Sequence, residues 1–390
     1  MLPTAAPEAI PDLDRVLSSG SPTESLEFLA NHFLSTGEYG LLFEARLMRK
    51  RLDLGLPLVQ TESVDLAAYQ NGVVEVAREV GGLFLATGNI ERAWPYFRAI
   101  GEPRPIESAI DAIEADQASD GVISIAFQEG VHPRKGLELI LAKNGMCRAI
   151  TGFGMTAVQK DRAECIGMLA RHIHAEILSR MAYAIKAREA AAPPATDSIL
   201  ERMAGRDWLF GEWDCYVDTS HLLSVVPYCV EITDPATLAI FHELCEYGKR
   251  LSAQFQSAGI PPFEDQFTAY GHYVEALRGN DVETHLDYFR QQVADSDPDI
   301  VGDAPGRTLT KLYLSLNRPG DALQTVLDHV FEDAPYGMPV PTAIQLCHAA
   351  RDFARMKELA LERGDLLSYA AASLSLRPSV ALSDPSLSSN

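Results

Sequence analysis

Hydrophobic residues recur at helical spacing along most of the chain, and short polar turns separate these stretches. In residues 73–84, VVEVAREVGGLF, the apolar positions lie three and four residues apart, which places them on one stripe of an α-helix. The following TGNIER predicts a break, with Gly88 as a left-handed C-cap and Asn89 as the N-cap of a second helix. A connection this short requires the two helices to pack antiparallel.

The same helix-turn-helix pattern recurs elsewhere in the sequence. It occurs in residues 26–48, 267–289 and 308–330, and in a weaker form in residues 343–361. The repetition predicts an all-α fold of stacked antiparallel hairpins, either an α-solenoid or an irregular helical array. We expect more than roughly 60% helix and no sheet larger than a hairpin.

Two of these hairpins resemble a known repeat. The segments ATGNIERAWPYF and LNRPGDALQTVL are similar to the helix-turn-helix centre of tetratricopeptide repeats. In that family a glycine closes the first helix, and a small residue early in the second helix lets the two backbones approach closely. Gly88 with Ala93, and Asn317 with Ala322, take those places.

The resemblance to tetratricopeptide repeats covers about half of the chain and is degenerate. Thr284 and Leu42 stand where two other hairpins would need the small residue, and the spacing between hairpins is irregular. Pro95 falls inside a predicted helix, where it removes a backbone hydrogen bond and predicts a kink.

The composition changes in the middle of the chain. Residues 120–160 contain more β-branched residues and glycine, although Pro133 suits the first position of a helix in PRKGLELILAK. The stretch AREAAAPPATDS at 187–198 predicts a hinge. We therefore expect an N-terminal helical half at 1–190, a C-terminal helical-repeat half at 197–373 and a disordered tail at 374–390.

Charge and cysteine content limit the range of partners and compartments. A formal net charge of −21 repels nucleic acid and anionic membranes, and it favours a basic partner. No stretch approaches the roughly 18 apolar residues of a membrane-spanning helix, and the N-terminus lacks the pattern of a signal peptide. The six cysteines form no CxxC motif, which fits a reducing cytoplasm.

The stretch RHIHAE raises the possibility of a metal site. His172 and Glu176 are four residues apart and share one face of a helix, whereas His174 lies about 200° from His172. Asp218 and His221 in YVDTSHLL, or His132 in GVHP, would have to supply the further ligands. Such a set suits zinc or a ferrous ion held by two histidines and one carboxylate.

Each of these residues also has an ordinary structural interpretation. Asp218 is a suitable N-cap, and His172 with Glu176 can form a solvated pair on a helix surface. GFGM lacks the third glycine of a dinucleotide-binding motif, so no organic cofactor is expected. Three functions follow. The first is a scaffold that binds a peptide or protein on a concave helical surface; the alternatives are a metal-dependent enzyme with its site between the two halves and a small-molecule sensor.

Overall fold

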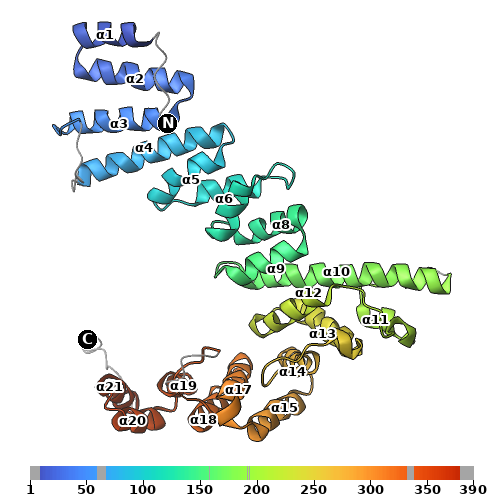
Figure 1. Cartoon of the computed structure of the whole chain (residues 1–390). Coiled ribbons are helices and arrows are strands. Elements are labelled where there is room, and N and C mark those ends of the chain that lie inside the picture. Colours follow the sequence, from blue (N-terminus) through green and yellow to red (C-terminus); the bar gives the residue numbers. More distant parts are fainter. Residues whose placement is uncertain are drawn as a thin grey trace, which may run out of the picture. The chain divides into compact units, whose positions relative to one another are not determined.

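Helices form almost the whole of the protein. The computed structural model describes residues 9–58, 67–157, 159–190, 192, 194–331 and 338–377. These residues form 21 α-helices with short 3-10 and π-helical turns, and helices account for 74% of the described residues (Figure 1). The described residues contain no β-strand, only an isolated bridge between Ala258 and Asp265. The prediction of an all-α fold is confirmed.

Local capping explains where the hairpins turn. Gly88 has a φ of 75°, and the Asn89 side chain accepts a hydrogen bond from the Arg92 backbone at 3.1 Å. Gly279, at φ 80°, ends a helix in the same way. Asn317 takes the place of glycine in another hairpin, with a φ of 58°, because asparagine tolerates the left-handed region better than most residues.

The residue contacts divide the chain into two units, Met1–Cys165 and Ile166–Asn390. The domain boundary that the sequence analysis places after residue 190 stays a prediction. Unit 1 contains α1 (Ala9–Ser19), α2 (Pro22–Thr36), α3 (Tyr39–Asp53), α4 (Ala67–Ala86), α5 (Ile90–Ala99), α6 (Arg104–Asp111), α7 (Asp120–Ile123), the π-helix η1 (Ser124–Gln128), α8 (Pro133–Asn144) and α9 (Met146–Met155).

Successive helices of unit 1 pack against each other from α1 to α6, and α8 packs on both η1 and α9. Their apolar stripes form one core that extends from α2 to Val131. Small residues bring α4 and α5 together: Ala93 is fully buried, and a Cβ at Gly81 would come within 2.8 Å of the Phe97 ring. Helix α5 continues through Pro95, which is exposed, so the proline does not end the helix.

Unit 2 contains all of the remaining helices, except that the first four residues of α10 belong to unit 1. They are α10 (Arg162–Glu189), α11 (Ile199–Met203), η2 (Asp207–Leu209), α12 (Thr219–Val225), η3 (Val226–Glu231), α13 (Pro235–Arg250), η4 (Ala253–Phe255), α14 (Gln266–Arg278), α15 (Val282–Asp295), α16 (Pro298–Val301), α17 (Ala304–Ser315), α18 (Pro319–His329), α19 (Ala343–Ala350), α20 (Phe353–Glu362) and α21 (Leu366–Ser375). From α13 onward each long helix packs on the next, as expected for a succession of hairpins. The apolar stripe of α10 is fully buried; its members are Ile166, Leu169, Ile173, Ile177 and Met181.

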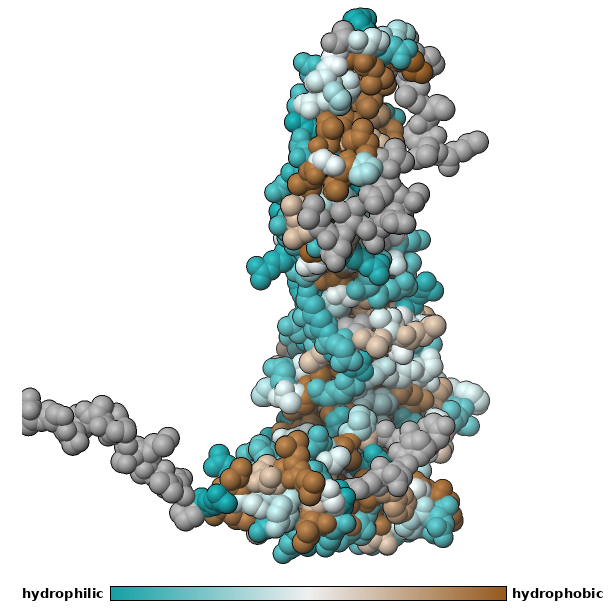
Figure 2. All heavy atoms as spheres, turned by 90° about the vertical axis from the view of Figure 1, so that its left-hand side faces the viewer, coloured by the Kyte–Doolittle hydropathy of each residue, from teal (hydrophilic) through white to brown (hydrophobic). Residues whose placement is uncertain are grey.

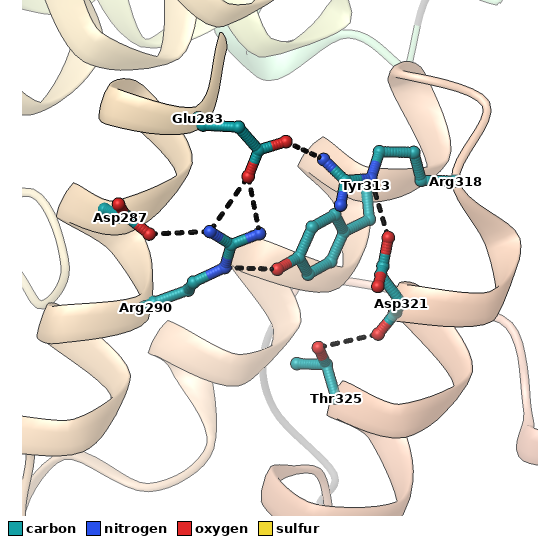
Figure 3. A network of polar contacts seen from close by, with 7 residues as sticks. All are labelled: Glu283, Asp287, Arg290, Tyr313, Arg318, Asp321 and Thr325. Carbon is teal, nitrogen blue, oxygen red and sulfur yellow. Dashed lines mark hydrogen bonds and ion pairs between the residues drawn. The ribbon is translucent and has the colours of Figure 1, made fainter.

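A polar network joins α15 to the hairpin of α17 and α18 (Figure 3). Glu283 accepts hydrogen bonds from Arg290 at 3.1 Å and also pairs with Arg318. The Arg290 Nε donates to the Tyr313 hydroxyl at 2.8 Å, and both guanidinium groups lie over the Tyr313 ring. Asp321 holds Arg318 at 2.6 Å. The network therefore connects three helices through one tyrosine.

A buried ion pair holds Phe331 and Met338, which lie between α18 and α19. Arg307 Nε donates to Asp303 Oδ2 at 2.8 Å, and both side chains are buried. Asp303 also accepts a hydrogen bond from the Phe331 backbone at 2.9 Å. Arg307 donates to the carbonyl oxygens of Phe331 at 2.9 Å and Met338 at 3.4 Å. Both ends of this connection are thus held by one pair of side chains.

Helix α21 reaches Ser375, so it includes the first two residues of the predicted tail. Residues 376 and 377 are described but not helical, and residues 378–390 of the predicted tail lie outside the described residues. Across the described part of the chain, every helix is too short or too polar to cross a membrane.

Candidate functional site

The two histidines of RHIHAE have different surroundings on α10. His172 is exposed, and Glu176, one turn away, pairs with Arg180 at 2.5 Å. His174 points elsewhere, as helix geometry requires, and its Nε2 lies 2.6 Å from Glu243 Oε2 on α13. His174, rather than His172, therefore connects α10 to another helix.

The other predicted ligands serve local roles. Asp218 caps α12, where it accepts hydrogen bonds from the Ser220 backbone at 2.9 Å and hydroxyl at 2.6 Å. These bonds lower the pKa of Asp218. His221 lies in the first turn of α12, beside Asp218. His132 belongs to unit 1; it precedes α8, and its Nε2 lies 3.4 Å from Asp111.

No three histidine, cysteine, aspartate or glutamate side chains of the described residues form a group that could hold a metal ion. The structure places Asp218 beside His221, and His172 one turn from Glu176. However, the Asp218 carboxylate is hydrogen-bonded to Ser220, and the Glu176 carboxylate is paired with Arg180. The zinc or ferrous site therefore stays a prediction that these contacts do not support.

Glu243 is a half-buried carboxylate that the sequence analysis did not single out. It accepts hydrogen bonds from the Ser198 hydroxyl and, at 2.8 Å, from the Ile199 backbone at the start of α11. Burial alone would raise the pKa of Glu243, but the bonds from His174, Ser198 and Ile199 outweigh burial and lower it. Because the Ser198 hydroxyl and His174 both bond to the carboxylate, this cluster joins α10, α11 and α13.

Unit 1 contains a groove between α5 and the segment formed by α7 and η1. The hollow has a volume of about 710 Å³ and is lined by Glu91, Trp94, Pro95, Arg98, Ala99, Gly121, Ser124, Ile125 and Glu129. Pockets of this size accommodate a ligand or one or two side chains of a peptide. Its lining combines an indole ring and aliphatic carbon with charged side chains.

Glu129 organises one side of the groove. Its Oε2 accepts hydrogen bonds from Trp94 Nε1 and from Arg98 Nη1, each at 2.8 Å. The first bond fixes the indole ring in the groove wall. The second holds a guanidinium group that remains largely exposed, since the Arg98 side chain is 68% accessible.

Glu91 lies one turn before Trp94 on α5 and has a different environment. Its carboxylate accepts a hydrogen bond from the Ser119 hydroxyl, and no cation of the described residues forms an ion pair with it. A Cβ at Gly121 would lie 2.6 Å from the Glu91 oxygens, so the carboxylate can occupy this position only beside a glycine. The groove thus contains two carboxylates and one guanidinium group.

The π-helix η1 brings Glu129 to the rim. In this wider turn the Glu129 backbone donates to the Ser124 carbonyl at 3.0 Å, one residue further back than in an α-helix. On the other side of the turn, Phe127 is buried against α8. A Cβ at Gly136 would come within 2.8 Å of the Phe127 backbone, so the close approach of α8 requires a glycine.

Sequence reasoning missed this groove because its residues come from two segments about thirty positions apart. The periodic pattern assigns Trp94 to the buried stripe of its helix, whereas the structure shows a half-buried side chain that lines the hollow. A tryptophan followed by proline and flanked by arginine and glutamate was the one local signal.

The fold and the groove define an all-α protein of packed helical hairpins with a charged hollow in unit 1. Comparisons with protein families, with curated proteins and with solved structures find no match to this chain.

Proposed function

We propose that this chain is an interaction protein that binds a basic segment of a partner protein, and that the groove of unit 1 receives an arginine or lysine side chain. The observation that carries the proposal is Glu91, a carboxylate without a cationic partner in the described structure, which lines the groove one turn before Trp94 on α5. Such a carboxylate and an indole ring attract the same kind of group, a cation on an aliphatic stem.

The proposed binding mode follows from the groove residues. The stem of the incoming side chain would lie along Trp94 and Ile125, and its charged end would reach Glu91. Arg98 occupies the side of the groove near Glu129, which directs the incoming cation towards Glu91. The net charge of −21 adds a long-range attraction that speeds the encounter with a basic partner.

The hairpin fold supports an interaction role for the chain. We infer that the array is a degenerate relative of the tetratricopeptide repeat, on the basis of the turns at Gly88 and Asn317 and of the buried Ala93 and Ala322 that follow them. A cytoplasmic location is part of the proposal. It is supported by the six cysteines, which are all free thiols, as in a reducing compartment.

The test measures the affinity of a fluorescein-labelled peptide of alternating arginine and serine by fluorescence anisotropy. We expect binding that weakens steeply between about 0.05 and 0.3 M salt, and little binding of a matched peptide of glutamate and serine. Trp94→Ala should weaken binding about tenfold. Glu91→Gln should weaken it roughly fivefold and reduce the salt dependence.

A matched pair of glycine variants separates the groove from the general negative charge. Gly121→Ala should displace the Glu91 carboxylate and weaken binding several-fold, whereas Gly82→Ala adds the same methyl group where no atom lies within 4 Å. Unchanged affinity in Gly121→Ala and Trp94→Ala, with the circular dichroism spectrum preserved, would show that the groove is not the site. Equal affinity for the glutamate peptide would rule out a preference for a basic partner.

A further inference from the structure

The last two helices of unit 2 expose an unusual amount of aliphatic surface. Helix α21 exposes Leu366 and Leu367, each 82% accessible, and Leu374, 60% accessible. Leu361 on α20 is 69% accessible, and Leu376 directly after α21 is 49% accessible. Hydrophobic residues gather at the lower end of the view in Figure 2, where these helices lie.

The exposed leucines lie on one side of α21. At 100° per residue, Leu366, Leu367 and Leu374 fall within an arc of about 140° that also contains the exposed Ala370 and Ala371. The opposite side carries Ala372, which is fully buried. Helix α21 therefore packs on α20 through its smaller residues and turns its leucines towards solvent.

The sequence of α21 is nearly symmetric about its centre. Residues 367–374 read LSYAAASL, and the midpoint lies between Ala370 and Ala371. When two such helices pair antiparallel about a two-fold axis at this midpoint, Leu367 faces Leu374 of the other copy. Ala370 then faces Ala371, and small residues at the crossing point allow a short distance between the helix axes.

The charge of this end of the chain also permits self-association. Residues 351–377 contain five basic residues (Arg351, Arg355, Lys357, Arg363, Arg377) and four acidic ones (Asp352, Glu358, Glu362, Asp365), so their net charge is 5 − 4 = +1. The whole chain carries −21. Two copies therefore repel each other less at this end than elsewhere, whereas a basic partner gains no attraction here.

We infer that two copies of this chain associate through an antiparallel, two-fold pairing of their α21 helices. Leu361 and Leu376 extend the contact on either side of the helix. Because the proposed contact consists of one ten-residue helix with two flanking leucines, the expected dimer is weak, with a Kd on the order of micromolar. This inference does not depend on the proposed peptide groove, which lies in unit 1.

Sedimentation velocity of the full chain tests the inference. We expect a shift from monomer to dimer as the concentration rises from about 1 to about 100 µM. Leu367→Glu should abolish the dimer, because the substituted carboxylate would face Leu374 of the other copy. Leu17→Glu is the matched control; Leu17 on α1 is also exposed, at 58%, and its substitution should leave the dimer intact.

A pair of double variants tests the register. Leu367→Glu with Leu374→Glu places like charges opposite each other, whereas Leu367→Lys with Leu374→Glu places opposite charges there. We expect the second variant to associate at least tenfold more tightly than the first. Equal behaviour of the two variants would reject the two-fold register, even if the protein dimerises. Because these leucines are exposed, neither variant should lose its helical circular dichroism spectrum.

A chain that ends at Arg377 tests the competing occupant, the segment 378–390 that follows. The inference predicts that the shortened chain dimerises as the full chain does. A full chain that stays monomeric throughout, with dimerisation only after the segment is removed, would show that the segment covers α21, and it would overturn the inference. A monomer in both cases would overturn it as well.

Discussion

The groove of unit 1 and the polar network of unit 2 are built from the same kinds of groups but leave different amounts of space. In each, a glutamate binds an arginine close to an aromatic side chain. Around Glu283 two guanidinium groups lie within 5.7 Å of the centre of the Tyr313 ring, and Tyr313 is only 4% accessible (Figure 3). Around Glu129 there is a single arginine, and the hollow beside Trp94 remains open.

The difference follows from whether each carboxylate is paired with a cation. Hydrogen bonds from Arg318 and Arg290 lower the pKa of Glu283, so this carboxylate is fully paired. Burial works to lower the pKa of Arg290, but bonds with Asp287, Tyr313 and Glu283 outweigh burial and raise it. In the groove the one guanidinium group pairs with Glu129, and Glu91 has no cationic partner among the described residues. A fully paired network holds helices together, whereas an incompletely paired one retains affinity for a cation from outside.

The largest expected effect comes from removing the two aromatic rings. Tyr313→Ala should lower the free energy of unfolding of unit 2 by about 3 kcal/mol, because a buried ring is lost from between two arginines. Trp94→Ala should lower the stability of unit 1 by only about 1 kcal/mol, because its ring already borders an open hollow. Urea denaturation followed by circular dichroism measures both changes. Equal losses would mean that the Trp94 side chain is as important for packing as Tyr313, which would contradict the comparison.

A histidine pair gives unit 2 a pH dependence that the groove lacks, because no histidine lines the groove. His272 Nδ1 on α14 lies 2.8 Å from His285 Nδ1 on α15, and its ring stacks on Tyr288. Lys249 and Glu246 face it from α13. Burial, His285 and Lys249 lower the pKa of His272, whereas Glu246 acts in the opposite direction.

Acidification should therefore destabilise unit 2. With a lowered pKa, folded His272 binds fewer protons than unfolded His272. The contribution of His272 to the free energy of unfolding is complete above the pKa of unfolded His272, which is about 6.5. This contribution is lost as the pH falls from there through the lowered pKa of folded His272. Urea midpoints at about pH 7.5 and 5.5 measure this loss. His272→Gln should reduce the loss, whereas His348→Gln, at an exposed position, should not. A wild-type midpoint that stays constant over this range would contradict the expectation.

The smallest expected effect concerns the exposed carboxylate of the network. Glu283→Gln should lower the thermal midpoint of unit 2 slightly at low salt, and about 1 M salt should remove the difference from wild type, because exposed ion pairs are screened. The same substitution should leave peptide binding in unit 1 unchanged. A loss that persists at high salt would show that the Glu283 hydrogen bonds, and not its charge, hold the helices.

Local features of the fold could be predicted from the sequence, and features that depend on distant residues could not. Gly88, Asn89 and Asp218 act on backbone groups within a few positions, so their capping roles are visible in the sequence. His174 finds its partner Glu243 at a separation of 69 residues, which no helical period indicates. The groove also needs the wide turn of η1 and the absence of a side chain at Gly121, and both depend on tertiary packing.

The buried pair of Asp303 and Arg307 has a practical consequence for protein engineering. This pair bonds to the backbone of Phe331, which follows α18, and of Met338, which precedes α19. These bonds do not involve the six residues between those two positions. Lengthening a connection whose ends are already fixed costs little in chain entropy. A fluorescent reporter or an affinity tag inserted between residues 332 and 337 should therefore leave α18 and α19 in place, and it would allow the protein to be labelled without altering either terminus.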